Sequence, residues 1–400
     1  MNLNLKEQLF TELRKKEDRM IEIRRYLHEH PELSFYETET AKYIVDFYKN
    51  KDLDVTVESH INGENGVIVT IDSGKPGKTL AIRADFDALP IEEATDLPFA
   101  SKNEGVMHAC GHDAHTAYML VLAETLAEMK DQLHGKIKVF HQPAEETPPG
   151  GAIGMIKAGC LEGVDNVAGI HVMSNFPFGK VFYREGEVQT ARSFFKLTIK
   201  GKGGHGSSPH EANDAIVAGS YFVTMLQTVI SRRINPFDMG VVTIGSFDAK
   251  GQFNIIKDQV VLEGDVRSMS AEARKVIDGE IKKVCEGVEA AFSVKCELDY
   301  TTDYPVLYND PAFTRQAAEI LKNTKLDRVE SVEITKPIPP SEDFSYFAEK
   351  VPSTFIYVGA EVEDKAVYPH HHPKFDINEK TLLICAEVMG SIVVDYLNEE

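Results

Sequence analysis

Cysteine is scarce in this sequence. The five cysteines among 400 residues are an odd number and are widely scattered: Cys110, Cys160, Cys285, Cys296 and Cys385. So few, unevenly spaced thiols exclude a fold held together by a disulfide framework. All except Cys110 fall in apolar or helical settings, where a free cysteine behaves as a small core residue.

Long apolar runs are also missing. No window of the chain approaches 18 uncharged apolar residues, which excludes a membrane-spanning helix. The segment Met1–Glu29 is charged throughout and has no apolar core of the kind that a signal peptide needs. We therefore expect a cytoplasmic protein.

Basic residues are outnumbered, with 43 lysines and arginines against 63 aspartates and glutamates and a formal net charge of -20. Such a negative field repels nucleic acid and anionic membrane surfaces, so we expect neither as a partner. The charge does not identify the substrate, because a local basic pocket can hold a carboxylate inside an acidic protein. The length and the hydrophobic content of 42% predict a folded protein of two domains.

Short β-branched runs alternate with helical stretches in the first half of the chain. Apolar residues at helical spacing from Leu9 to Leu27, followed by Pro31, predict an amphipathic opening helix. Four runs predict strands: 66–71, 79–83, 136–140 and 167–172. A helical pattern covers 116–130, and the alternation resumes after Pro305. This rhythm is typical of an α/β sheet domain.

A different order of elements lies between these two α/β segments. Strand, helix, strand, strand, helix and strand are expected in turn at 194–200, 212–231, 241–247, 259–267, 271–289 and 293–300. This βαββαβ order is that of a ferredoxin-like unit. We therefore predict one domain made of 1–190 and 305–400, and a second domain, 191–304, inserted into it.

Four short segments hold an unusual density of metal-binding residue types: His108–His115, Gln142–Glu146, Gly169–Val172 and Pro369–Pro373. Three of them lie at the end of a predicted strand or in a loop, where ligands gather in open α/β sheets. Cys110 and His112 present a thiolate and an imidazole across one glycine, which lets the backbone turn sharply enough to aim both at one point. A buried structural cysteine beside a surface histidine is the alternative.

The pair Glu145–Glu146 adds a second type of group. One carboxylate can bind an ion while its neighbour takes a proton from water. An isolated Glu–Glu pair is more often an ordinary acidic loop, but this one closely follows the apolar run 137–140. His171 and His371 taken singly are more often structural. Together these side chains suit two ions of zinc, manganese or cobalt, and not calcium, which prefers oxygen ligands.

Six motifs along nearly the whole chain carry a resemblance to a known family. They are His28–Ser34, Arg83–Pro90, Gly105–Asp113, Gln142–Glu146, Gly203–His210 and Ser341–Ser345. The chain resembles the metal-dependent amidohydrolase and carboxypeptidase family of hippurate hydrolases, N-acetyldiaminopimelate deacetylases, indoleacetyl-amino-acid hydrolases and aminoacylases. The resemblance implies a zinc-peptidase-like, mixed-sheet catalytic domain and an inserted ferredoxin-like lid and dimerisation domain.

The resemblance also implies roles for individual residues of the catalytic domain. Two divalent ions would be held by Cys110, His112, Glu146, His171 and His371, with Cys110 bridging them. Glu145 would be the general base, and Asp87 would orient the site from behind the ligands.

In the inserted domain, the resemblance gives roles to three more residues. His205 would reach into the site of a neighbouring subunit and stabilise the oxyanion, which implies a homodimer or a higher homo-oligomer. Asn254 and Arg267 would hold the substrate's free carboxylate, which a guanidinium can do with two hydrogen bonds.

Three consecutive histidines leave the last ligand ambiguous. His371 fits the family's pattern because a proline stands two places after it, and His372 is the alternative. His115, one turn after His112 on a predicted helix, is a further candidate ligand. His108 is expected to line the pocket without binding metal.

The function that we expect is hydrolysis of the amide bond of N-acyl amino acids, with N-acetyl or aromatic acyl groups, or of short peptides. A dipeptidase, aminopeptidase or carboxypeptidase with the same chemistry is the nearest alternative, because these substrates differ mainly in the pocket that they need. A metal-binding protein without catalysis is a third possibility. A pure binder, however, has no use for a second glutamate, Glu145, beside a ligand.

Overall fold

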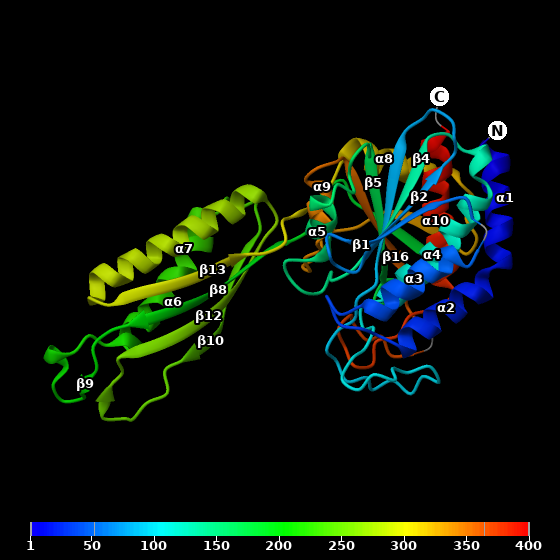
Figure 1. Ribbon diagram of the computed structural model, residues 1–400. Helices are drawn as coiled ribbons and strands as arrows, with labels where there is room; N and C mark the ends of the chain where they lie inside the picture. The colour runs from blue at the N-terminus through cyan, green and yellow to red at the C-terminus, as the bar shows by residue number, and fades with distance from the viewer. Residues whose placement is uncertain (1, 52, 364, 399–400) are drawn as a thin grey trace. The chain divides into compact units, whose positions relative to one another are not determined.

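The computed structural model describes residues 2–51, 53–363 and 365–398 (Figure 1). The chain forms two compact units, the first made of Met1–Gly186, Tyr308–Lys336 and Asp343–Glu400, the second of Glu187–Leu307 and Pro337–Glu342. The second unit is thus inserted into the sequence of the first. Among the described residues, no helix has the length and apolar character needed to span a bilayer.

An eight-stranded mixed sheet forms the centre of the first unit. Its strands lie in the order β1-β2-β4-β3-β5-β16-β6-β15. Their bounds are β1 (Thr56–Ile61), β2 (Gly66–Asp72), β3 (Thr79–Asp85), β4 (Lys136–Gln142), β5 (Asn166–Met173), β6 (Lys180–Tyr183), β15 (Ser331–Ile334) and β16 (Ser353–Gly359). The inner strands β4, β3, β5 and β16 are parallel, whereas β1, β2 and β6 join antiparallel neighbours. The predicted α/β class with a mixed sheet is confirmed.

Helices cover this sheet. They are α1 (Asn2–Lys15), α2 (Glu17–Glu29), α3 (Thr38–Lys49), α4 (His112–Glu128), α5 (Gly151–Lys157), α8 (Pro311–Asn323), α9 (Ser345–Ala348) and α10 (Thr381–Leu397), with a short 3-10 helix η1 (Lys130–Gln132). Both α4 and α10 are buried almost throughout, because they contact the central strands on one side and α1 and α2 on the other. The single opening helix that the sequence predicts is two helices, which are separated at Lys16.

The second unit is a sheet covered by two helices. Its elements are β7 (Gly186–Gln189), β8 (Ala191–Lys200), β9 (Gly204–His205), η2 (Pro209–Glu211), α6 (Ala215–Arg233), β10 (Gly240–Asp248), β11 (Ile255–Ile256), β12 (Gln259–Ser268), α7 (Ala271–Phe292) and β13 (Lys295–Thr302). The short strand β14 (Leu307–Asn309) follows where the chain returns to the first unit. Four strands form an antiparallel sheet in the order β10-β12-β8-β13. With α6 and α7, this is the βαββαβ arrangement of a ferredoxin-like unit.

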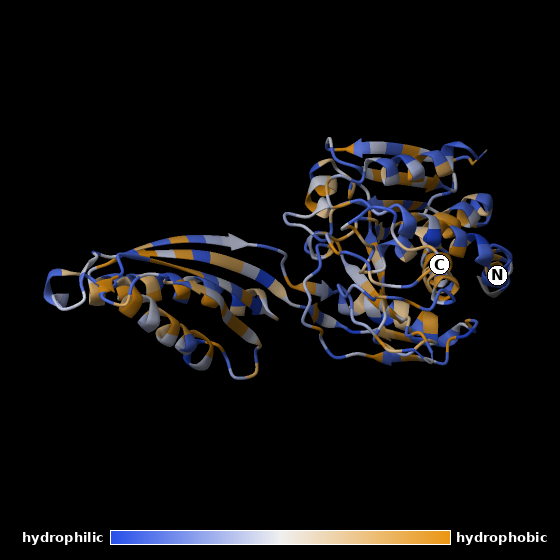
Figure 2. Ribbon diagram, turned by 90° about the horizontal axis from the view of Figure 1, so that it is seen from below, coloured by the Kyte–Doolittle hydropathy of each residue, from blue (hydrophilic) through white to orange (hydrophobic). Residues whose placement is uncertain are grey.

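Hydrophobic and hydrophilic residues alternate along the strands of the second unit, as the colours of the ribbon show (Figure 2), and on β8 buried residues alternate with more exposed ones. On β8, Phe195, Leu197 and Ile199 are buried and share a core with side chains of α6 and α7, such as Phe222 and Ile281. The period of two is what a sheet with one covered face requires. The apolar pattern of 194–200 therefore reports which face of the strand the helices cover.

The short segment 337–342 belongs to the second unit. The sequence pattern predicts it in the first. Backbone hydrogen bonding explains the difference. Gln189 forms a bridge with Ile338, and the Thr190 N–H donates to the carbonyl oxygen of Pro340 at 3.0 Å. These contacts join residues about 150 positions apart, so no local pattern in the sequence predicts them.

Candidate metal centre

Polar side chains gather where the parallel strands of the first unit end. Cys110 and His112 stand at the start of α4, Glu145 and Glu146 follow β4, and His171 lies near the end of β5. The carboxyl ends of parallel neighbours meet at one edge of a sheet, which is where α/β proteins bind ligands. The topology therefore brings these segments together at one edge of the sheet.

The predicted ligands form overlapping groups. The side-chain donor atoms of Cys110, His112 and His171 all lie within 4.8 Å of one another, and so do those of Cys110, Glu146 and His371. Within these groups, the Cys110 sulfur is 3.5 Å from His171 Nε2, and His371 Nε2 is 3.2 Å from Glu146 Oε1. Cys110 is common to both groups.

Two of the histidines are oriented by hydrogen bonds that their Nδ1 atoms form with backbone carbonyl oxygens. His112 Nδ1 lies 3.0 Å from the carbonyl oxygen of Asp87, and His171 Nδ1 lies 2.7 Å from the carbonyl oxygen of Val172. These contacts leave the Nε2 atoms to face the other candidate ligands. His112 Nε2 is buried and has no hydrogen-bond partner in the described parts of the chain. A bound cation would satisfy it.

The charges of the site also favour a cation. Burial, together with the charges of Glu146 and Glu145, raises the pKa of the Cys110 thiol well above its usual range. Burial alone would lower the pKa of His112, but the charges of Asp85 and Asp87 outweigh burial and raise that pKa to about 10. Carboxylates therefore dominate the potential of this pocket, and a divalent cation would neutralise it and stabilise the thiolate.

Gly111 makes the turn between Cys110 and His112. Its φ is 90°, in the left-handed region that side chains rarely adopt, and a Cβ atom here would lie 2.5 Å from Val172 Cγ2. We expect Gly111→Ala to destabilise the protein by about 2 kcal/mol or more through backbone strain and overpacking, and to weaken metal binding. Thermal unfolding and metal content measure the two effects.

A matched control exists for this substitution. Gly63 also has a left-handed φ, 77°, but no atom lies within 4 Å of the position that its Cβ would take. Gly63→Ala should therefore show the strain without the clash and keep full metal content. If Gly111→Ala bound metal as well as Gly63→Ala does, the glycine would not be setting the site's geometry.

The remaining histidines near the site have other partners. His115 Nδ1 lies 2.6 Å from Asp85 Oδ1, and His115 Nε2 accepts the Val172 N–H at 3.0 Å. His370 Nε2 bonds the carbonyl oxygen of Val172, whereas the ring of His372 stacks on Tyr368. His372 Nδ1 also accepts the Lys374 N–H at 3.0 Å. His115 groups with Asp85 and His112, but of these three histidines and His371, only His371 shares a group with Cys110 among the described residues.

His108 is fully buried beside the site. Burial lowers its pKa to about 4, so it is neutral at ordinary pH. Neither of its ring nitrogens has a hydrogen-bond partner among the described residues. It lies outside the groups of candidate ligands formed by those residues.

A buried ionic network that sequence reasoning missed lies behind the ligands. Arg83 bonds Asp85, Gln142 and Asp343, and Gln142 Nε2 also donates to Asp343 at 2.8 Å. Asp343 Oδ2 in turn accepts the N–H of Ala152, at the start of α5. The network ties the ends of β3 and β4 to the segment after 342. Both Arg83 and Asp343 lie in sequence motifs, but their pairing across 260 positions gives no local signal.

The predicted residues of the second unit lie in two places. His205, on β9, pairs with β11, which directly follows Asn254, and its Nδ1 accepts the hydroxyl of Ser207 at 2.8 Å. Arg267 lies near the opposite end of β12, where its Nε donates to Asp265 Oδ2 at 2.8 Å. The structure therefore brings His205 and Asn254 together and leaves Arg267 at the other end of the sheet.

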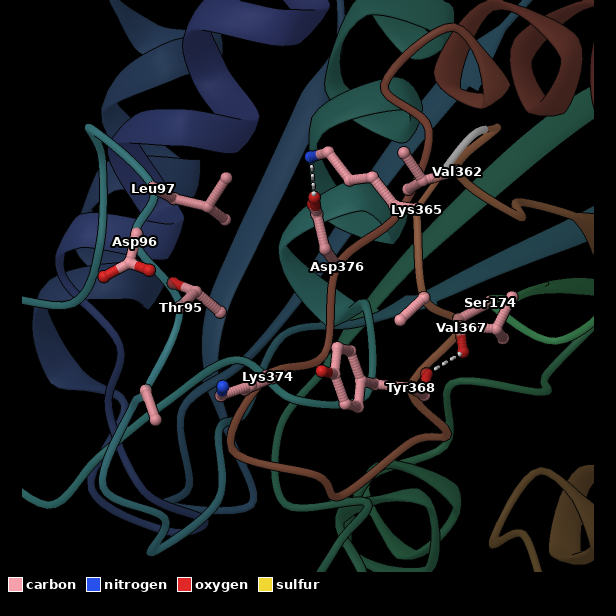
Figure 3. A pocket seen from close by; sticks show the side chains of 12 residues that line it. Thr95, Asp96, Leu97, Ser174, Val362, Lys365, Val367, Tyr368, Lys374 and Asp376 are labelled. Carbon is pink, nitrogen blue, oxygen red and sulfur yellow. Dashed lines mark hydrogen bonds and ion pairs between the residues drawn. The ribbon is translucent and has the colours of Figure 1, made fainter.

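A cavity of about 370 Å³ borders the loop that carries His371 (Figure 3). Apolar side chains such as Leu97 and Val367 share its lining with polar ones. Lys365 forms an ion pair with Asp376 at 3.2 Å, and Lys374 is exposed. Asp96 also lines the cavity, so lysines and aspartates are present in equal number and its charged lining favours neither sign of ligand charge.

Comparison with known proteins gives consistent matches over the whole chain. Residues 81–395 match Peptidase family M20/M25/M40. Among curated relatives, the Bacillus subtilis protein YhaA, which carries an amidohydrolase name, is 43% identical over 95% of both chains. N-acetyl-L-cysteine deacetylase from Bacillus subtilis is 38% identical, covering 92% of this chain and 85% of its own. Thermostable carboxypeptidase 1 from Saccharolobus solfataricus is 37% identical, covering 99% and 100%.

Solved structures agree with these matches. A protein from methicillin resistant Staphylococcus aureus, assigned as an aminohydrolase, is 64% identical over the full length of both chains, with a TM-score of 0.94. The Bacillus subtilis protein YxeP, described as a dinuclear metal binding peptidase from the M20 family, is 33% identical, with a TM-score of 0.82. That alignment covers 97% of this chain and 100% of the other.

Proposed function

Because this chain belongs to Peptidase family M20/M25/M40, we propose that it hydrolyses the amide bond of N-acyl amino acids at a centre of two divalent ions. Two groups of ligands that share Cys110, beside a second glutamate, Glu145, support this most strongly. Deacetylases of N-acyl amino acids among its relatives support the substrate class. We also propose that the enzyme is cytoplasmic and acts on small molecules. The strongly negative charge supports solubility and argues against a nucleic-acid partner.

Five residues would hold the ions, with Cys110 between them: Cys110, His112, Glu146, His171 and His371. Thiolate, imidazole and carboxylate ligands suit zinc, manganese or cobalt. When bound, such ions polarise a carbonyl group and lower the pKa of water. Asp87 would orient His112 through its carbonyl oxygen, and the carboxylate of Asp87 accepts the N–H of Glu146 at 3.0 Å.

Glu145 is the proton carrier in this proposal. Its side chain is buried, and one of its oxygens lies 4.0 Å from His112 Nε2. It groups with His112 and Glu146, but among the described residues it shares no group with Cys110. As general base it takes a proton from the attacking water, and as general acid it gives that proton to the leaving amine. A nearby carboxylate that is not needed as a ligand is what this transfer requires.

The two ends of the second unit's sheet would serve two different sites. From the start of β12 to Arg267 the strand spans roughly 27 Å, so one small substrate cannot touch Asn254 and Arg267 of the same chain. If both hold a substrate carboxylate or its neighbouring atoms, they come from two subunits. This supports a homodimer in which His205 and Asn254 of the partner subunit complete the site.

A carboxypeptidase or dipeptidase is the second candidate, and the identity to a carboxypeptidase over the full chain favours it. Both reactions cleave an amide beside a free carboxylate, so the chemistry does not separate them. The cavity beside the His371 loop is a place where the two substrate classes would differ in fit.

A substrate panel tests the proposal. We expect metal-stripped protein to be inactive, and protein reloaded with zinc, manganese or cobalt to cleave N-acetyl amino acids, hippurate or N-acetyldiaminopimelate faster than dipeptides. Amine release measures the rate for each substrate. A preference for dipeptides would favour the peptidase, and no turnover with both ions bound would favour a non-catalytic metal-binding protein.

A further inference from the structure

The loop between α2 and α3 has two buried polar residues to which the proposed chemistry gives no role. They are Ser34, the last residue of the His28–Ser34 motif, and Glu37, with exposures of 7% and 0%. Both side chains point away from solvent and contact groups next to the Glu145–Glu146 pair. These contacts carry the inference.

Glu37 holds the peptide that precedes Glu145. One oxygen of Glu37 accepts the backbone N–H of Ala144 at 2.8 Å, and the other accepts the side-chain N–H of Asn65 at 3.1 Å. Ala144 has a φ of 53°, in the left-handed region that is unfavourable for a residue with a Cβ atom. This conformation persists only if its surroundings stabilise it, and a charge-assisted hydrogen bond does so.

Ser34 acts on the other side of the pair. Its hydroxyl donates to Asp87 Oδ2 at 2.7 Å, and the same oxygen accepts the N–H of Glu146 at 3.0 Å. The backbone N–H groups of Ala144 and Glu146 are therefore both held by carboxylates. The Glu37 carboxylate belongs to the loop between α2 and α3, and the Asp87 carboxylate accepts a hydrogen bond from that loop.

A purely structural role does not account for Glu37. No lysine, arginine or histidine forms an ion pair with it among the residues that the structure describes. Burial and the nearby charge of Asp87 raise the pKa of Glu37 to about 7, which shows that burying a charged carboxylate here costs free energy. An apolar side chain would fill the same space without that cost. We therefore infer that the Glu37 carboxylate stabilises the left-handed conformation of Ala144.

We propose that Glu37 is a positioning residue for the catalytic base: it fixes the left-handed peptide of Ala144 and so aims the Glu145 carboxylate. This rests on the proposed role of Glu145 in amide hydrolysis. Glu37 touches neither substrate nor any candidate ligand in this arrangement. Its loss should therefore affect the rate of the chemical step more than the binding of substrate or metal.

Three variants of the full-length, metal-loaded enzyme test this. We expect Glu37→Ala to lower kcat by about 10- to 100-fold, because a small misplacement of a catalytic group has effects of that size, with KM within about twofold and both ions retained. Glu37→Gln keeps an oxygen that can accept the Ala144 N–H and should recover most of kcat. Glu37→Asp keeps the charge, but its side chain is one methylene too short to reach the Ala144 N–H, so it should lose kcat as Glu37→Ala does. It takes the place of Glu37→Ala if that variant does not fold.

Glu32 provides the matched control. It is a glutamate of the same loop, and its carboxylate accepts the N–H and hydroxyl of Thr40 at the start of α3, at 2.7 and 2.8 Å. Glu32→Ala removes a helix cap, so it should lower the unfolding temperature but leave kcat unchanged. A similar loss of kcat in Glu32→Ala and Glu37→Ala would mean that the loop acts only through stability, and would overturn the proposal.

Amide hydrogen exchange separates this inference from the proposed function. We expect the Ala144 amide to exchange faster in Glu37→Ala and to stay protected in Glu32→Ala, whatever substrate the enzyme takes. Unchanged exchange at Ala144 would overturn the positioning role even if kcat fell. A wild-type protein that cleaves nothing in the substrate panel would instead overturn the proposed function, while the exchange data still report on Glu37.

Discussion

We expect the Glu145→Gln variant to lose about 10³-fold or more in kcat and still to bind two metal ions. Glutamine has nearly the shape of glutamate, so it fits the buried site, but it cannot accept a proton from water. Glu145 lies 4.0 Å from His112 Nε2 and groups with His112 and Glu146. Among the described residues it belongs to neither of the two groups that contain Cys110, so a role as base leaves both of those groups intact. Steady-state hydrolysis of an N-acetyl amino acid, together with elemental analysis of the metal, measures both effects.

The neighbouring residue is the control for this variant. Glu146 Oε1 lies 3.2 Å from His371 Nε2, and Glu146 groups with Cys110 and His371, whereas Glu145 shares no group with Cys110 among the described residues. Glu146→Gln should therefore lose metal as well as activity, whereas Glu145→Gln loses activity alone. A fully active Glu145→Gln variant would show that another group moves the proton, and a variant depleted of metal would make Glu145 a ligand.

The sequence was sufficient to predict the class of the fold and to select segments whose candidate ligands the structure brings close together. Runs such as 79–83 and 136–140 are rich in apolar side chains because most of their residues are buried, so the local pattern predicts these strands. The candidate ligands stand at strand ends and at the start of a helix, and each lies in a short segment with a recognisable chemical pattern. Local sequence therefore carries most of the information about this centre.

What the sequence did not predict depends on contacts between distant residues. Arg83 and Asp343 pair across 260 positions, and Glu37 bonds the peptide of Ala144 across 107 positions. Each residue is ordinary in its own segment, and only the folded chain shows that it contacts the segments that carry the candidate ligands and Glu145. The candidate ligands are thus easier to select from sequence than the residues that would position them.

The second unit shows the same limit in another form. His205 and Arg267 have suitable chemistry, but the spacing along the chain does not reveal that they lie at opposite ends of β12. That separation makes it necessary to ask which subunit supplies each residue. The answer decides whether a single chain can contain a complete site.

Mixing two inactive variants should restore activity if His205 acts on the partner's substrate. We expect His205→Ala alone to lose about 10²- to 10³-fold in kcat, the usual effect of removing an oxyanion donor. A dimer of one Glu145→Gln chain and one His205→Ala chain contains one intact site, formed by Glu145 of the second chain and the imidazole of the first. After subunit exchange in an equal mixture, about a quarter of wild-type activity should return, because half of the dimers are mixed and each has one working site.

The control for the mixture is His210, an exposed histidine of η2 close to His205 in sequence. His210→Ala should be fully active alone and should not change the complementation. Mass spectrometry under native conditions verifies that mixed dimers form. If mixed dimers are present and no activity returns, His205 serves the site of its own chain. The separation of Asn254 from Arg267 along β12 would then no longer support a site shared between subunits.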